Sequence, residues 1–220
     1  MRGHWEVASR RGPLVLGTVV RTARENDRVA AFLDRDGVLN EGVPDPESGL
    51  IESPLRVEDV RLLPGVAAAL RELVEAGYAL VCASNQPAAA KGKFSLGELV
   101  AVHERMIELL AREGVSLDGS LLCPHHPEGV VAELSGPCAC RKPAPGMLLD
   151  AASVLGLDLD TSWMVGDTDA DMQAGRAAGC RTVLIEYPGS AHKRSGRASP
   201  DLRAVDLAEG VAQLLDHDPG

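Results

Sequence analysis

The chain has 220 residues, 45% of them apolar and 3% aromatic, and 32 acidic against 22 basic residues give a net charge of −10. This length fits one domain of ordinary globular composition, and a nucleic-acid binder would need a basic surface instead. No apolar run approaches the roughly 20 residues that span a bilayer, so we expect neither a nucleic-acid partner nor a membrane partner.

The first 28 residues are interpreted as an extension ahead of a folded domain at 29–220. Their apolar stretch 13–20 weakly resembles the core of a signal peptide, yet no small-residue cleavage site follows it and Arg21 and Arg24 come next. Three of the five cysteines cluster with a histidine, which fits metal binding in a reducing compartment better than a disulfide framework. We therefore expect a cytoplasmic protein.

Short apolar runs alternate with amphipathic segments along the chain. We expect strands at 29–33, 78–83, 120–122, 163–165 and 181–186, and helices at 64–77, 95–112, 145–155, 169–178 and 206–215. Ser95 and Glu98 have the spacing of a helix capping box, whereas the proline-rich segment 40–63 should be irregular and 123–143 and 188–200 should be loops. The alternation predicts an α/β fold with a central parallel sheet between two layers of helices.

Acidic residues follow two of the predicted strands. Asp34 and Asp36 come after the first strand, and Asp167 comes after the fourth, with Asp169 and Asp171 just beyond it. The carboxyl ends of parallel strands share one edge, where ligands bind, so these carboxylates should converge and need a cation between them. Their oxygens suit Mg²⁺. Either motif alone is as often a surface turn, but the two together are a much stronger signal.

Polar and basic residues complete the candidate site. Ser84, Asn85 and Gln86 follow the second strand, and Arg141 and Lys142 precede the helix at 145–155. A hydroxyl, an amide and an ammonium around a metal-bound carboxylate are typical of a phosphoryl-transfer site. In isolation, Ser84 would be read as a turn residue and Lys142 as a solvated surface charge.

Four residues with metal-ligand spacing lie in the segment 123–143. They are Cys123, His125, Cys138 and Cys140. Three thiolates and one imidazole are typical of a closed, tetrahedral zinc site of the structural type. His126 competes with His125 as the fourth ligand, and a loop of reduced cysteines without metal is the alternative.

Taken in order, these motifs resemble those of the haloacid dehalogenase-like (HAD) phosphatases. The motifs are Asp34-Arg-Asp-Gly37, Ser84, Lys142, and Gly166-Asp167 with Asp171. The Cys/His loop is similar to that of the D-glycero-D-manno-heptose 1,7-bisphosphate phosphatases, and histidinol-phosphate phosphatases share much of the pattern. The resemblance spans residues 29–216 and implies a HAD-like Rossmannoid three-layer sandwich without a cap domain but with a zinc-binding loop.

The resemblance also implies a role for each site residue. Asp34 would be the nucleophile that forms an aspartyl-phosphate, and Asp36 would be the general acid that then activates water. Asp34, the backbone carbonyl of Asp36, and Asp167 would hold Mg²⁺, while Ser84 and Lys142 would hold phosphoryl oxygens. The residues expected to recognise the substrate are Arg35, Asn85, Gln86 and Arg141. The family pattern uses the first histidine, which favours His125 as the zinc ligand.

Two departures from the family bear on the substrate rather than on the chemistry. Pro87-Ala-Ala-Ala-Lys91 stands where relatives often carry Ser-Gly-Ile-Ala-Arg, and Thr168 stands where heptose phosphatases tend to carry Lys. We expect a Mg²⁺-dependent phosphatase that removes the 7-phosphate of D-glycero-D-manno-heptose 1,7-bisphosphate. Histidinol phosphate is the alternative substrate, and a catalytically idle zinc-bearing interaction module is the alternative from another class. The sequence fits a monomer without fixing the oligomeric state.

Overall fold

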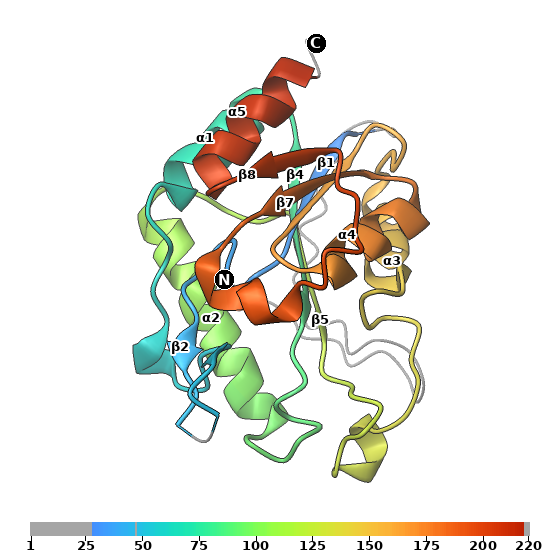
Figure 1. The fold of residues 1–220 in the computed structure, drawn as a ribbon. Coiled ribbons are helices and arrows are strands. Elements are labelled where there is room, and N and C mark those ends of the chain that lie inside the picture. The colour runs from blue at the N-terminus through green and yellow to red at the C-terminus, as the bar shows by residue number, and fades with distance from the viewer. Residues whose placement is uncertain (1–27, 47, 218–220) are drawn as a thin grey trace.

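The structure is a computed structural model that describes residues 28–46 and 48–217 (Figure 1). The expected N-terminal extension therefore lies outside the described residues, apart from Arg28. Six strands form one parallel sheet in the order β5 (Gly119–Cys123), β4 (Ala79–Asn85), β1 (Ala30–Leu33), β6 (Trp163–Gly166), β7 (Arg181–Ile185) and β8 (Leu202–Ala204). The helices are α1 (Val66–Glu75), α2 (Leu96–Arg112), α3 (Gly146–Leu155), α4 (Asp169–Ala178) and α5 (Leu207–His217).

Helices cover both faces of the sheet. Helices α1, α2 and α5 lie on one face, where Leu33 and Leu70 belong to one buried cluster, and α3 and α4 lie on the other, where Phe32 and Met147 belong to a second (Figure 1). Successive residues of a strand point to opposite faces, so every residue of β1 is buried and its sequence is a continuous apolar run. The predicted three-layer α/β fold is confirmed.

Two helices begin with a capping box. Ser95 and Glu98 start α2, as the sequence predicts, and Thr168 and Asp171 start α4 in the same way. Asp171 accepts from the backbone N of Thr168 at 2.9 Å and from its hydroxyl at 2.5 Å. The first turn of α4 therefore fixes the position of the Asp171 carboxylate.

The structure adds three strands that the sequence analysis did not foresee. Two of them, β2 (Val43–Pro44) and β3 (Ile51–Glu52), form an antiparallel hairpin in the segment expected to be irregular. The third, β8, pairs with β7 at the edge of the main sheet. Strands of two or three residues are too short to show an alternating pattern, and Pro44 is tolerated because the hairpin is all edge.

The described residues hold no separate cap domain. The chain between β1 and α1 contains the hairpin and one short 3-10 helix, Val57–Asp59, and two further 3-10 helices, Ala132–Leu134 and Pro188–Lys193, lie in the other long connections. Among the described helices, none combines the length and the apolar character that crossing a bilayer requires.

Candidate active site

A cavity of about 600 Å³ opens where the carboxyl ends of β1, β4 and β6 meet. Its walls bring together most of the residues expected at the site, namely Asp34, Asp36, Ser84, Asn85, Arg141, Lys142 and Asp167. Asp171 also lines the cavity, as expected for the carboxylates that follow the fourth strand, although the sequence analysis assigned it no separate role. Arg35 and Gln86, expected to recognise substrate, are each 1% exposed and lie behind the wall.

Asp34 follows β1 with its Oδ1 atom held from three sides. The hydroxyl of Ser84 donates to it at 2.6 Å, the backbone N of Arg35 donates at 2.7 Å, and Nζ of Lys142 lies 3.1 Å away. Burial raises the pKa of Asp34 to about 6, although the charge of Lys142 opposes the rise. The result is a carboxylate oriented beside a cation, as a nucleophile needs to be.

The Lys142 ammonium lies between two carboxylates in the interior. Its Nζ is 2.5 Å from Oδ1 of Asp171 and 3.1 Å from Oδ1 of Asp34, and it donates to the carbonyl of Ala83 at 2.7 Å. Burial alone would lower the pKa of Lys142, but the two carboxylates outweigh it and raise that pKa above its ordinary value. Lys142 is therefore a fixed positive charge at this edge of the sheet.

Asn85 holds the backbone of Lys142 in place. Its Nδ2 donates to the Lys142 carbonyl at 2.8 Å, and its Oδ1 accepts from the Lys142 backbone N at 3.0 Å. Both ends of the amide are thus used within the protein, so the structure assigns Asn85 a positioning contact that the sequence analysis did not foresee.

Three carboxylates converge beside Lys142. Asp34, Asp167 and Asp171 each bring an oxygen within 4.8 Å of the others. Burial, together with the charges of Asp34 and Asp171, raises the pKa of Asp167 well above its ordinary value. Such crowding of hard oxygen ligands fits a divalent cation. Asp169 is turned away and accepts from the backbone N of Ser195 at 2.7 Å.

Two glycines let these loops approach one another. Gly37 has a φ of +83°, and a Cβ there would collide with the Asp167 carboxylate. A Cβ on Gly166 would collide with the side chain of Asp171. Glycine at both positions is therefore a steric requirement for bringing the carboxylates together.

Four side chains orient Asp36. Asn40 donates to its Oδ1 at 2.8 Å, while Gln86 at 2.6 Å and Ser53 at 2.8 Å donate to its Oδ2, and Arg35 pairs with the same oxygen at 3.1 Å. Burial alone would raise the pKa of Asp36. The charge of Arg35 and the three neutral donors outweigh burial, so the pKa of Asp36 lies below its ordinary value. Arg35 and Gln86 thus support Asp36. Asn40 and Ser53 carry no motif, so nothing in the sequence signals that they contact Asp36.

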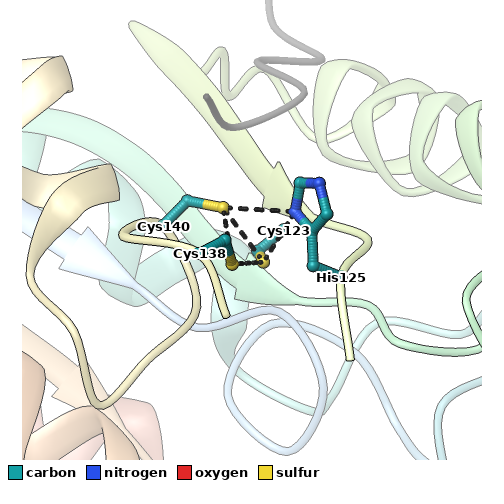
Figure 2. Close-up of side chains that lie close together, drawn as sticks. All are labelled: Cys123, His125, Cys138 and Cys140. Carbon is teal, nitrogen blue, oxygen red and sulfur yellow. Dashed lines mark hydrogen bonds between the residues drawn. The ribbon is translucent and has the colours of Figure 1, made fainter. Parts of the chain in front are cut away.

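Figure 2 shows the second candidate site, formed by Cys123, His125, Cys138 and Cys140. The sulfur atom of Cys140 lies 3.2 Å from that of Cys123 and 3.3 Å from that of Cys138. Nδ1 of His125 lies 3.4 Å from Cys140 and 3.6 Å from Cys123. Zinc–sulfur bonds of about 2.3 Å at a tetrahedral centre place the sulfur atoms about 3.8 Å apart, so the cluster needs only slight expansion to hold the ion.

His126 lies outside this cluster, although the sequence left it as a competing ligand. Its Nδ1 accepts from the backbone N of Glu128 at 3.1 Å.

Within the cluster, hydrogen bonds from Cys140 and His125 outweigh burial and lower the pKa of Cys123 to about 6. A thiolate at Cys123 is the form that binds metal.

The Cys/His cluster is coupled to the cavity by the chain itself. Arg141 and Lys142 directly follow Cys140, and Nη1 of Arg141 donates to the carbonyl of His125 at 3.1 Å. In the same loop, the backbone N of Val130 donates to the carbonyl of Ala90 at 2.7 Å. The cluster therefore braces both the basic dipeptide and the segment that follows Ser84.

Comparisons with known proteins agree with this geometry. A family model described as HAD-hydrolase-like matches residues 139–213. The D-glycero-beta-D-manno-heptose-1,7-bisphosphate 7-phosphatase of Yersinia pestis is 42% identical over 180 residues, which cover 82% of this chain and 92% of that protein. The D-glycero-D-manno-heptose-1,7-bisphosphate 7-phosphatase of Thermosynechococcus vestitus is 42% identical over 198 residues, 86% of this chain and 97% of that protein.

A solved structure is similar over nearly the same span. It is the D,D-heptose 1,7-bisphosphate phosphatase of B. bronchiseptica in complex with magnesium and phosphate, with a TM-score of 0.71 and 33% identity over 87% of this chain and 99% of that one. The chain therefore belongs to the HAD-like phosphatases and, within them, to the family of the D-glycero-D-manno-heptose 1,7-bisphosphate 7-phosphatases.

Proposed function

We propose that this protein removes the 7-phosphate of D-glycero-D-manno-heptose 1,7-bisphosphate through an aspartyl-phosphate on Asp34. The observation that carries the proposal is the contact set of Asp34: its Oδ1 is held by Ser84 and Lys142 at the floor of the cavity, which frees Oδ2 to attack phosphorus. The relatives that are 42% identical to it over 180 and 198 residues bear the name of this activity. An idle binding module would have no use for a buried carboxylate kept beside Asp36 and Asp167.

The chemistry divides between two carboxyl groups. In the first step, Asp34 forms a bond to phosphorus while the bond to the sugar oxygen breaks, and Asp36 passes a proton to that oxygen. The donors around Asp36 favour its carboxylate, so it must take up this proton when the substrate binds, and the negative charge of the phosphate beside it would favour that uptake. In the second step, Asp36 takes a proton from water, the water oxygen bonds to phosphorus, and the bond to Asp34 breaks. Lys142 and Ser84 face the phosphoryl oxygens, where charge is redistributed in the transition state.

Asp34 and Asp167 would hold Mg²⁺ together with the backbone carbonyl of Asp36, and Asp171 lies close enough to contribute. The bound ion would neutralise phosphoryl charge. The support for this assignment is the convergence of the carboxylates within 4.8 Å and the raised pKa of Asp167, which a nearby cation would reverse.

The substrate assignment rests on charge at the cavity mouth. Arg141 and Lys91 line the cavity and are not among the side chains that contact Asp34, in a protein whose net charge is −10. Local basic groups of this kind fit the second phosphate of a bisphosphate, and the planar fork of Arg141 suits a bidentate contact.

The substrate proposal predicts a ranking within a panel of phosphate esters. Phosphate release should be fastest with a heptose 1,7-bisphosphate and much slower with histidinol phosphate. Only the bisphosphate has a second phosphate that Arg141 can bind while the first one reacts. Both heptose anomers, histidinol phosphate and a simple sugar monophosphate should be compared with Mg²⁺ present. Preference for histidinol phosphate would favour the alternative substrate, and no Mg²⁺-dependent release from any ester would favour the idle module.

Replacing each basic residue of the Arg141-Lys142 pair separates chemistry from recognition. Lys142→Ala should lower kcat by about a hundredfold or more, as does the loss of other preorganised electrostatic contacts. Arg141→Ala should mainly raise KM, because it removes binding that ground state and transition state share. Steady-state kinetics on a sugar bisphosphate test this division. Identical kinetic patterns in the two variants, or a reversed pattern, would contradict it.

We further propose that Cys123, His125, Cys138 and Cys140 bind one Zn²⁺ as a structural site. The support is the near-tetrahedral spacing of the four ligand atoms, which leaves no open position for chemistry. All five cysteines of the sequence are free in the described residues, which suits a reducing compartment such as the cytoplasm.

Removing one ligand should release the ion and loosen the loop that presents Arg141 and Lys142. Cys138→Ser should lower the zinc content measured on protein purified without chelator and should also lower activity, although zinc does no chemistry. Cys180→Ser, at a buried thiol outside the cluster, should keep both. A zinc-free protein with normal activity would rule the site out.

A further inference from the structure

The β2–β3 hairpin forms one wall of the cavity and is held there from both sides. Lys93, in the β4–α2 connection, pairs with Asp45 at 2.7 Å, and Lys193, in the β7–β8 connection, pairs with Glu52 at 2.7 Å. Asp45 directly follows β2, Glu52 is the last residue of β3, and both line the cavity. Two ion pairs to separate segments therefore set how the hairpin sits over the cavity.

Ser53 follows the hairpin directly and reaches from it to Asp36. Its hydroxyl donates to Oδ2 of Asp36 at 2.8 Å, and both residues line the cavity. The other side chains on Asp36 belong to the floor of the site: Arg35 and Asn40 come from its own loop, and Gln86 follows β4. Among these partners, Ser53 is the one that belongs to the hairpin.

The chemistry of Ser53 also differs from that of the other partners. A guanidinium and the NH₂ groups of Asn40 and Gln86 can only donate hydrogen bonds, whereas a serine hydroxyl rotates and can donate or accept. Ser53 can therefore keep its bond to the Asp36 carboxyl both before and after that group has passed its proton to the leaving oxygen.

We propose that Ser53 is a positioning residue that aims the Asp36 carboxyl at the leaving-group oxygen and couples its aim to the seating of the hairpin. The inference rests on the role proposed for Asp36. Substrate contacts with the hairpin would then act on proton transfer, in a fold whose described residues include no cap domain to do so.

The test compares two substrates that differ in their need for a proton. The sugar of a sugar phosphate would leave as an unstable alkoxide, so its oxygen must be protonated. The p-nitrophenolate of p-nitrophenyl phosphate is a stable anion and leaves without a proton. Ser53→Ala should lower kcat/KM for the sugar phosphate by about tenfold, which is a part of what general acid catalysis supplies. It should keep kcat/KM for p-nitrophenyl phosphate within about twofold of the wild-type value. Ser53→Thr, which keeps the hydroxyl, should restore the ratio of the two values.

Two matched variants make the outcome decisive. Ser48→Ala removes a hydroxyl of the same hairpin that bonds Oδ1 of Asp45, whereas Lys93 pairs with Oδ2 and keeps the hairpin seated. This variant should leave the ratio unchanged. Asp36→Asn should lower kcat/KM for the sugar phosphate far more than kcat/KM for the aryl phosphate. Equal losses on both substrates in Ser53→Ala, beside a selective loss in Asp36→Asn, would overturn the role of Ser53 alone. The absence of a selective loss in Asp36→Asn would overturn the acid role of Asp36 and this inference with it.

Discussion

The site depends on one buried ammonium placed between carboxylates. Lys142 is 2% exposed and contacts both Asp34 and Asp171, while Asp167 lies beside them. Removing one partner from a buried ion pair costs about 3–5 kcal/mol, because the remaining charge is left without water or counter-charge. The carboxylates can therefore gather at the end of the sheet only while the charge of Lys142 balances part of theirs.

Much of the surrounding structure serves to present that ammonium. Asn85 clamps the Lys142 backbone from the end of β4, and the Cys/His cluster fixes the chain just before it at Cys140. On the opposite side, the capping box of α4 holds Asp171, and Gly166 leaves room for its side chain. The Cys/His cluster and a helix cap thus both bear on the position of one side chain, that of Lys142.

The sequence was sufficient to predict five of the six strands of the sheet, the helices and the convergence of Asp34, Ser84, Lys142 and Asp167, because apolar runs followed by polar motifs mark strand ends. It did not reveal the hairpin, whose strands have two residues each. It also could not show which way a polar side chain turns. Arg35 and Gln86 were expected at the substrate, yet they lie behind the wall and hold Asp36, since only tertiary packing decides between inward and outward rotamers.

The most direct test of the account is to find the phosphoryl group on Asp34. Wild-type enzyme mixed with a sugar bisphosphate and Mg²⁺ should be quenched in acid within a turnover, digested and examined by mass spectrometry. We expect a phosphoryl group on the peptide that carries Asp34 and neither label nor turnover in Asp34→Asn, while Asp169→Asn retains both. Label on another residue, or full turnover in purified Asp34→Asn, would contradict it.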